Sequence, residues 1–198
     1  MTSVQAVLAG IHPAGDDERA DLERVRAMLA TGADPWTRSS ALHLTGSALI
    51  FHPPSDRVLL RWHERQQTWL QVGGHADPGE ADPFAVALRE AREETGLADL
   101  VAWPDAAAPG PIQLAIVPVA PGKGEPAHEH ADVRYILATA QPEAAVPESD
   151  SARVRWLPLE AALADVREDN LRVCLARLAA LRRQVAHDEK RASTTVEG

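Results

Sequence analysis

The sequence predicts an α/β fold, an α/β/α sandwich around a mixed β-sheet. Segments typical of strands alternate along the chain with segments typical of helices, and such interleaving predicts a sheet covered by helices. A hairpin pattern over residues 41–63 is followed by a strongly capped helix pattern over 83–95. The hairpin supplies antiparallel pairing and the helix supplies a crossover, so we expect a sheet of mixed direction.

The length suits one domain of about 150 residues with additions at its ends, since the chain has 198 residues. We expect an N-terminal helix and linker over 1–39, a central domain over 40–165 and a C-terminal helix and tail over 166–198.

The net charge is −9, whereas a general nucleic-acid binder is more often basic, so no nucleic-acid partner is expected. The chain has one cysteine, no signal-peptide pattern and no apolar run of the ~20 residues that span a bilayer. We therefore expect a cytoplasmic protein without a membrane partner.

The first half of the chain contains a helix pattern and then strand patterns. Apolar residues recur at helical spacing in 16–31, and Gly32 can end that helix. Segments 41–53 and 57–63 predict two strands, because the PPSD between them is a turn sequence. Residues 68–75, TWLQVGGH, predict a short strand that runs into two glycines.

The second half predicts three further strands and two helices. A helix begins at Pro158, and the last helix covers roughly 169–187, followed by a frayed polar tail over 188–198. The strands are expected at 112–120, 133–140 and 152–158.

The last helix carries a narrow apolar seam at spacings of three and four residues. We expect this seam to dock on the domain's own sheet or on the N-terminal helix, and contact with a second copy in a homodimer is the alternative. The seam consists of Leu171, Cys174, Leu178, Leu181 and Val185.

Helix 83–95 is the best-defined element in the sequence. Asp82 is a good N-cap, Pro83 suits the first helical position, and Gly96 suits the position after the last turn. Phe84, Leu88, Ala91 and Thr95 share one face, which can pack on the sheet.

The other face of this helix carries Glu90, Glu93 and Glu94 within about 100° of one another. Like charges at this spacing repel, so a sequence chosen for stability alone would avoid them, and a site for a hard divalent cation is one interpretation. The alternative is a solvated face laced with ion pairs, since Arg89 and Arg92 lie among the acids.

The stretch GGHADPGE followed by REAREETGL resembles the Nudix box. Eight residues separate Glu80 from Arg89 where the family has seven, and we place the extra residue in the loop around Ala81 and Asp82. The pattern is filled by Gly74, Glu80, Arg89, Glu90, Ala91, Glu93, Glu94, Gly96 and Leu97.

This resemblance implies a Nudix-like α/β/α sandwich with extra N- and C-terminal helices. It implies a hydrolase that uses Mg²⁺ or Mn²⁺ to cleave a nucleoside diphosphate linked to another moiety, a small-molecule substrate. The implied metal ligands are Glu90, Glu93, Glu94, the Gly74 carbonyl and Glu80. The implied catalytic groups are Glu93 and Glu94, with Arg89 orienting a glutamate.

The general base can be a glutamate of the box or a residue of another loop. The segment GEPAHEHADVRY offers His128, Glu129, His130 and Asp132, of which Glu129 is the candidate base. We predict His75, His128 and His130 as substrate-binding residues; the alternative is that all are polar loop residues. Glu148 and Asp150 are further candidate bases.

Two other functions compete with hydrolysis. The first is a non-catalytic Nudix-like module that senses a nucleotide or metabolite, and the second is a scaffold whose terminal helices bind a partner. Isopentenyl-diphosphate isomerases share the Nudix fold and use a catalytic cysteine, whereas Cys174 lies in the apolar seam of the last helix. The sequence holds no signature of one substrate.

Overall fold

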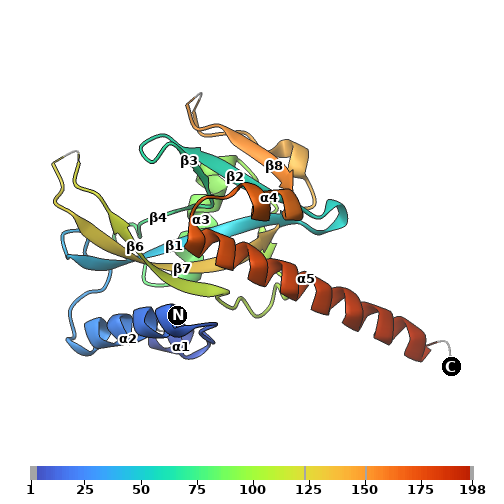
Figure 1. Ribbon diagram of the computed structural model, residues 1–198, viewed down its shortest axis with the longest axis horizontal. Helices are drawn as coiled ribbons and strands as arrows, with labels where there is room; N and C mark the ends of the chain where they lie inside the picture. Colours follow the sequence, from blue (N-terminus) through green and yellow to red (C-terminus); the bar gives the residue numbers. More distant parts are fainter. Residues whose placement is uncertain (1–3, 123, 150, 197–198) are drawn as a thin grey trace.

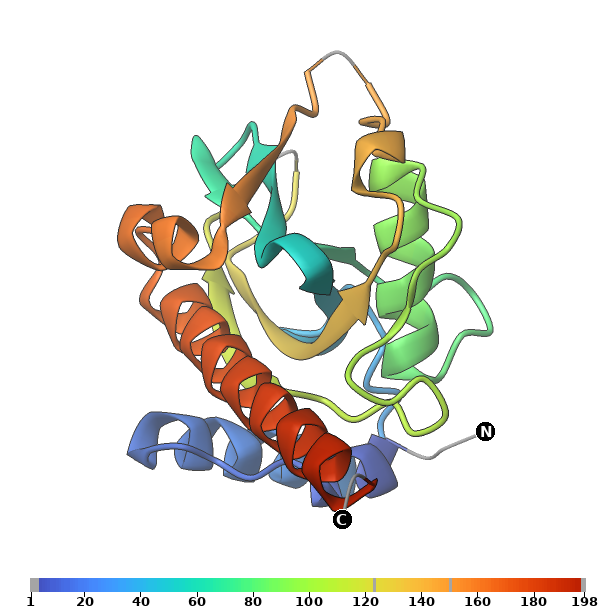
Figure 2. The ribbon, with the colours of Figure 1, turned by 90° about the vertical axis from the view of Figure 1, so that its right-hand side faces the viewer.

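The fold is an eight-stranded mixed sheet between two layers of helices (Figures 1 and 2). The structure is a computed structural model that describes residues 4–122, 124–149 and 151–196. It confirms the predicted α/β sandwich. Within the part of the chain that the structure describes, no helix has the length and apolar character needed to cross a membrane.

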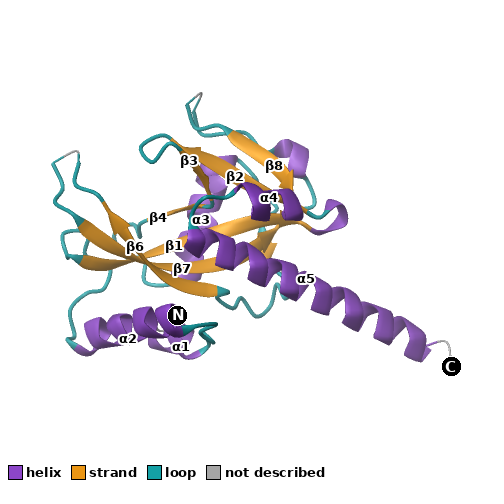
Figure 3. Cartoon of the chain, in the orientation of Figure 1, coloured by secondary structure: helices purple, strands orange, loops and turns teal. Residues whose placement is uncertain are grey.

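The strands lie in the order β3-β2-β1-β7-β5, with β4 paired to β1, β6 to β7 and β8 to β2 (Figure 3). The central pair, β1 with β7, is parallel, and the other pairs are antiparallel. The strands are β1 (Leu42–His52), β2 (Arg57–His63), β3 (Thr68–Leu70), β4 (Val72–Gly74), β5 (Val101–Ala102), β6 (Gln113–Val119), β7 (His128–Ala138) and β8 (Val154–Pro158).

The described part of the chain forms five α-helices. Figure 2 shows α3 on one side of the sheet and α5 on the other, with α2 below them. Two short 3₁₀ turns cover Pro53–Ser55 and Pro142–Ala144. The helices are α1 (Val4–Ala9), α2 (Asp16–Ala30), α3 (Pro83–Thr95), α4 (Leu159–Asp165) and α5 (Asp169–Val196).

The two ends of the chain differ from the sequence prediction. Helix α1 was not predicted, because six residues are too few to show helical periodicity, yet it buries Val4 and Leu8 in the core. The predicted frayed tail over 188–198 is wrong where the structure describes it, since α5 continues to Val196. Residues 188–196 contain no glycine or proline and include several good helix formers, so nothing in them ends the helix.

Strand β1 supplies side chains to two separate cores, because successive residues of a strand point to opposite faces. Leu44 and Ile50 join the cluster that includes residues of α1, α2 and α3. Leu49 and Phe51 join the cluster that includes residues of α4 and α5. Nine residues of β1 in succession are buried, so the strand is the centre of the sandwich.

The seam of α5 docks on the domain's own sheet over its first half. Leu171, Cys174 and Leu178 are fully buried beside Phe51 and Ile136. Burial raises the pKa of the Cys174 thiol to about 12, which keeps the sulfur protonated and unreactive. The predicted docking is thus confirmed for these residues.

The second half of α5 extends past the sheet (Figure 1). Leu181 and Val185 are only half-buried there. The homodimer contact therefore stays a prediction, and these two residues are the part of the seam left to make it.

The two terminal segments meet through an ion pair. Glu18 of α2 pairs with Arg177 of α5, and both side chains are mostly buried. Glu18 also accepts hydrogen bonds from the backbone N–H of Ala14 at 2.8 Å and of Leu114 at 3.2 Å. Arg177 donates to the Ile112 carbonyl at 2.5 Å, so both helices are tied to the start of β6.

We expect Leu175→Ala to lower the free energy of unfolding by about 2–5 kcal/mol, because it removes a fully buried side chain from the α5 core. Val173→Ala, on the exposed side of the same helix, should change it by less than about 0.5 kcal/mol. Urea unfolding followed by circular dichroism measures both. Equal effects would contradict the docking of this helix.

Candidate active site

Helix α3 forms as the sequence predicts. The Asp82 side chain accepts a hydrogen bond from Phe84 N at 3.0 Å, and Pro83 occupies the first helical position. Gly96 ends the helix with φ +67°, a conformation that favours glycine, and its N–H donates to the Arg92 carbonyl at 2.8 Å. Ala91 is fully buried against the sheet.

The predicted inner face is buried less evenly than expected. Ala91 and Thr95 are buried, while Phe84 and Leu88 are half-buried. Val86 and Ala87, which the helical-face argument did not include, are fully buried. The buried face of α3 is therefore turned around the helix axis from the predicted one, and it includes Glu94, which was predicted on the opposite face.

The three glutamates of α3 differ in exposure. The Glu93 side chain is 56% exposed, Glu90 is half-buried, and Glu94 is 8% exposed. Glu94 lies under β4, where it accepts a hydrogen bond from Gly73 N at 3.1 Å. Arg61 of β2 places its Nε 3.4 Å from the same carboxylate.

Burial raises the pKa of both inner carboxyls. Desolvation raises the pKa of Glu94 to about 7, against the opposing effects of Arg61 and the Gly73 N–H. The pKa of Glu90 is also raised by burial, with Arg89 opposing. A cation bound beside these two neighbouring carboxyls would stabilise their ionised forms.

Gly74 brings the backbone of β4 against Glu90. A Cβ at this position would lie 2.6 Å from the Glu90 carboxylate, so a side chain here would displace it. Glycine is therefore required if the backbone and the carboxylate are to lie this close.

Arg89 connects the acids of the loop and the helix. Its Nη1 donates to Glu90 at 3.0 Å and to Glu93 at 2.9 Å, while its Nη2 donates to Glu80 at 2.9 Å and to the His75 carbonyl at 2.8 Å. The predicted support of Glu93 by Arg89 is therefore present. Glu80 also meets Nε at 3.0 Å, and Arg89 lowers the pKa of Glu80.

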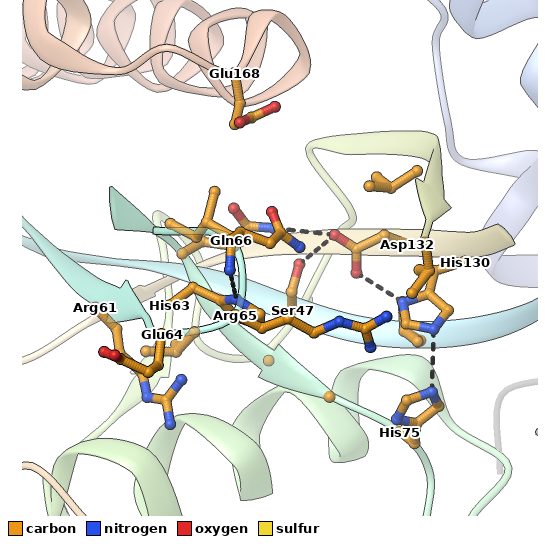
Figure 4. Close-up of a pocket in the computed structure, with 18 of the residues that line it drawn as sticks. Ser47, Arg61, His63, Glu64, Arg65, Gln66, His75, His130, Asp132 and Glu168 are labelled. Atoms are coloured by element: carbon orange, nitrogen blue, oxygen red, sulfur yellow. Dashed lines mark hydrogen bonds between the residues drawn. The ribbon is translucent and has the colours of Figure 1, made fainter. Parts of the chain in front are cut away.

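A cavity of about 800 Å³ adjoins this acidic cluster (Figure 4). Gly73, Gly74, Arg61 and Glu148 are among the residues that line it on the side of the acids. Figure 4 shows Asp132 and Ser47 in the middle, with Arg61 toward one end and His75 and His130 toward the other.

Asp132 is buried and accepts four hydrogen bonds. The donors are Thr45 Oγ1 at 3.0 Å, Ser47 Oγ at 2.8 Å, Gln71 Nε2 at 3.1 Å and Arg134 Nε at 2.8 Å. Such a carboxylate is fixed in place and poorly suited to remove a proton from water, so it organises the cavity floor instead.

Arg134 is 2% exposed and is the largest buried polar side chain of this floor. It also donates to Gln113 Oε1 at 3.0 Å and to Asn170 Oδ1 at 2.9 Å, which joins β6 and the start of α5 to the cavity. The sequence analysis missed this residue together with Thr45 and Ser47. The signal was present, because polar residues at 43, 45 and 47 alternate within an otherwise apolar strand.

Comparison with known proteins assigns the chain to a family. The NUDIX domain profile matches residues 42–178, which is more than half of the chain. The chain belongs to the NUDIX family. The family predicted from the motif is thereby confirmed.

One named relative is similar to part of the chain. A Lactococcus lactis subsp. cremoris protein named "Probable DHNTP pyrophosphohydrolase" is 32% identical over 112 residues, which are 54% of this chain and 60% of that protein. The match thus spans less than two thirds of that relative's length.

Solved structures share the NUDIX fold. A NUDIX family hydrolase from Clostridium perfringens has a TM-score of 0.54 and 27% identity, over 70% of this chain and 97% of its own. A C. elegans Ap4A hydrolase binary complex has the same TM-score at 19% identity, over 70% of this chain and 96% of its own, which is a likeness of fold.

The candidate general bases of this NUDIX domain differ in whether they line the cavity. Glu129 pairs with Arg24 of α2 at 2.5 Å and is not among the described residues that line the cavity. Glu148 does line the cavity and pairs with Arg61, which is also close to Glu94. Asp150 lies outside the described residues.

The predicted substrate-binding histidines line the cavity and contact one another. Burial lowers the pKa of His75 to about 4 and of His130 to about 3, so both are neutral at pH 7 and add no positive charge for a phosphate. His128 lies beside them, with its Nε2 3.1 Å from that of His130. His43, a fourth member of this group, was not predicted.

We expect the ionisation of Glu94 to remove stability from the metal-free protein as pH rises from 4.5 to about 7, against the stability that the lowered pKa values of His75 and His130 add over much of this window. Glu94 is protonated in both states below its ordinary pKa of 4.5, and the unfolded chain ionises first above it, because the folded pKa is about 7. The loss is on the order of 3 kcal/mol and levels off above pH 7.

Urea unfolding in a chelator-containing buffer at several pH values measures this loss. Glu94→Gln removes the titration while it keeps an acceptor for Gly73 N, so its free energy of unfolding should increase relative to that of the wild type over the same window. Glu160→Gln, an exposed change on α4, should follow the wild type. Parallel profiles for wild type and Glu94→Gln would contradict the burial of an ionisable Glu94.

Proposed function

We propose that this chain is a cytoplasmic pyrophosphohydrolase that depends on Mg²⁺ or Mn²⁺ and cleaves the diphosphate linkage of a nucleoside diphosphate derivative. The reaction is attack of water on phosphorus. The observation that carries the proposal is the pair of buried or half-buried carboxylates, Glu90 and Glu94, next to the glycines that line a cavity of about 800 Å³. The confirmed family and the named relative support it.

The donor set fits a hard divalent cation. The site offers carboxylate oxygens from Glu90, Glu93 and Glu94 and a backbone carbonyl at Gly74, and Mg²⁺ prefers such oxygen ligands. Gly74 leaves space against Glu90 that a Cβ would fill. Among the described contacts, Arg89 engages Oε1 of Glu90 and Oε2 of Glu93, so the second oxygen of each remains for a cation.

When bound, the cation would neutralise the diphosphate and lower the pKa of a bound water. The residues of the chain prepare that environment. Arg89 holds Glu90 and Glu93 at fixed positions, and Glu80 holds Arg89. Because these contacts exist before substrate arrives, little reorganisation is needed during the reaction.

Glu148 is the candidate base that the geometry favours over Glu129. It lines the cavity on the side of Glu94, whereas Glu129 is not among the described residues that line the cavity. The ion pair with Arg61 would hold the Glu148 carboxylate near the attacking water.

Trp62 is the candidate surface for the base of the nucleotide. It lines the cavity and meets Trp69 edge to face, with ring centroids 5.4 Å apart. Arg153 lies 4.9 Å above the Trp62 ring centroid. In contrast, Trp103 and Trp156 pack against the core clusters and have no such access. A flat ring at the edge of a polar cavity can stack on a purine or a pterin alike.

The first test is a screen of nucleoside diphosphate derivatives and nucleoside or pterin triphosphates with Mg²⁺ and with Mn²⁺. Phosphatase-coupled phosphate release detects turnover. Metal-dependent turnover of one class is expected, with loss of signal after chelation. Binding without turnover of any compound would favour the sensor function instead.

With the best substrate of that screen, Glu94→Gln and Glu93→Gln should each lower kcat/KM at least about 100-fold, because each removes a cation ligand worth several kcal/mol in the transition state. Glu160→Gln on the exposed side of α4 is the matched control and should retain full activity. Circular dichroism checks that each variant folds. Full activity in both α3 variants would refute the cation site.

A further inference from the structure

Four imidazoles converge beside the cavity, apart from the carboxylates of α3. His43 comes from β1, His75 follows β4, and His128 and His130 come from β7. Their Nε2 atoms form a chain of contacts: His43 to His75 at 3.1 Å, His75 to His130 at 3.2 Å, and His130 to His128 at 3.1 Å. Figure 4 shows His75 and His130 facing one another.

The tautomers of the two outer rings follow from their backbone contacts. Nδ1 of His43 lies 3.1 Å from the Ser40 carbonyl, and Nδ1 of His128 lies 3.0 Å from the Pro126 carbonyl. A carbonyl oxygen can only accept, so each Nδ1 carries the proton. The Nε2 of each neutral outer ring therefore presents a lone pair to the cluster.

Hydrogen bonds between neutral rings cannot satisfy all three Nε2 contacts. Each inner ring, His75 or His130, has at most one proton on Nε2 to donate. If both donate outward, the Nε2 atoms of His75 and His130 lie 3.2 Å apart with no acceptor between them. If His75 donates inward to His130, the lone pairs on Nε2 of His130 and His128 face each other at 3.1 Å. At least one contact is repulsive in every neutral arrangement, and buried polar groups rarely remain in such conflict.

A cation at the centre removes the conflict, because all four Nε2 atoms can then present lone pairs. We propose that His43, His75, His128 and His130 form a second metal site, for a borderline divalent ion of the Zn²⁺ class. Imidazole nitrogen suits Zn²⁺ and its neighbours in the first transition row, whereas Mg²⁺ prefers oxygen.

Three of the six separations between the ligand nitrogens agree with tetrahedral coordination. Zn–N bonds of about 2.0–2.1 Å imply a separation of about 3.3 Å between ligand nitrogens. The three contacts at 3.1–3.2 Å lie within about 0.2 Å of that separation. His43, His128 and His130 each offer a ligand nitrogen within 4.8 Å of the others, so these three are the minimal set.

The surroundings supply the support that metal-bound histidines require. A ligating imidazole usually donates its other N–H to a carbonyl or carboxylate, as His43 and His128 do here. His43 and His130 are also direct partners in the β1–β7 ladder, so the strands fix their positions. The ion would join β1, β7 and the residue that follows Gly74.

This site goes beyond the proposed hydrolase activity. Four protein ligands close the coordination of the ion, which is typical of a structural site. Its expected role is to fix the loop after β4 and to place positive charge at the cavity edge. The carboxylate site of α3 stays the place of reaction.

The test uses the full chain without an affinity tag, freed of metals with a strong chelator. Titration with Zn²⁺ in millimolar Mg²⁺ should give one tightly bound Zn²⁺ per chain, counted by elemental analysis. Zn²⁺ should also raise the midpoint of thermal unfolding. Co²⁺ as the probe should give the intense visible absorption of a tetrahedral site. No stoichiometric Zn²⁺ binding in the presence of Mg²⁺ would overturn the proposal.

Variants locate the ion. His128→Gln and His130→Gln should each weaken Zn²⁺ binding at least tenfold, and His43→Gln should do the same where it folds by circular dichroism. His187→Gln on the exposed part of α5 is the matched control and should bind as the wild type does. Unchanged binding in both His128→Gln and His130→Gln would overturn the site.

A Glu90→Gln, Glu94→Gln double variant separates the two metal sites. It should lose Mg²⁺-dependent hydrolysis and retain its Zn²⁺. Loss of Zn²⁺ from this variant would place the ion among the carboxylates and refute the histidine site. Loss of hydrolysis alone leaves the histidine site standing, so the two proposals fail by different results.

Discussion

The parallel pairing of β1 with β7 is the constraint on which the rest of the molecule depends. The register runs from Leu42 opposite Glu129 to Phe51 opposite Ala138. It sets Thr45 beside Asp132, so the cavity floor is built from directly paired residues. A slip of one residue would turn every side chain to the other face and exchange the cavity floor with the core. Burial of both faces of β1 opposes such a slip.

The positively charged side chain of Arg89 holds the acidic cluster together. Glu80, Glu90, Glu93 and Glu94 carry four negative charges when ionised, and Arg89 cancels one of them and bonds to three of the acids. A single guanidinium with five N–H groups can do this where a lysine could not, because its donors form a rigid fork. Arg89 thus reduces the repulsion among the glutamates. The negative charge that remains would attract a further cation. Of the two interpretations of the acidic face, the structure contains the ion pairs, and cation binding at the same face stays a prediction.

The parts predicted well are those set by local sequence. The ends of α3 follow from Asp82, Pro83 and Gly96 alone, and its acidic face follows from helical geometry. The family motif supplied Glu80, and its bond to Arg89 is present despite the extra residue in the loop.

The parts not predicted depend on contacts between distant segments. Thr45 and Asp132 are 87 positions apart, and no local pattern states that β1 lies beside β7. The same holds for Glu129, because its partner Arg24 lies in a helix outside the central domain. His43 lacked any motif, and only the register with His130 brings it into the group.

The ion pair between Glu18 and Arg177 has a consequence for synthesis of the chain. The two residues are 159 positions apart, so Glu18 is translated well before Arg177. Until Arg177 has been made, this carboxylate lacks its counter-charge and is better left in water than buried. Burial of Glu18 is therefore favoured only after α5 has been synthesised. Helix α2 is made before α5 but gains this buried ion pair only from it.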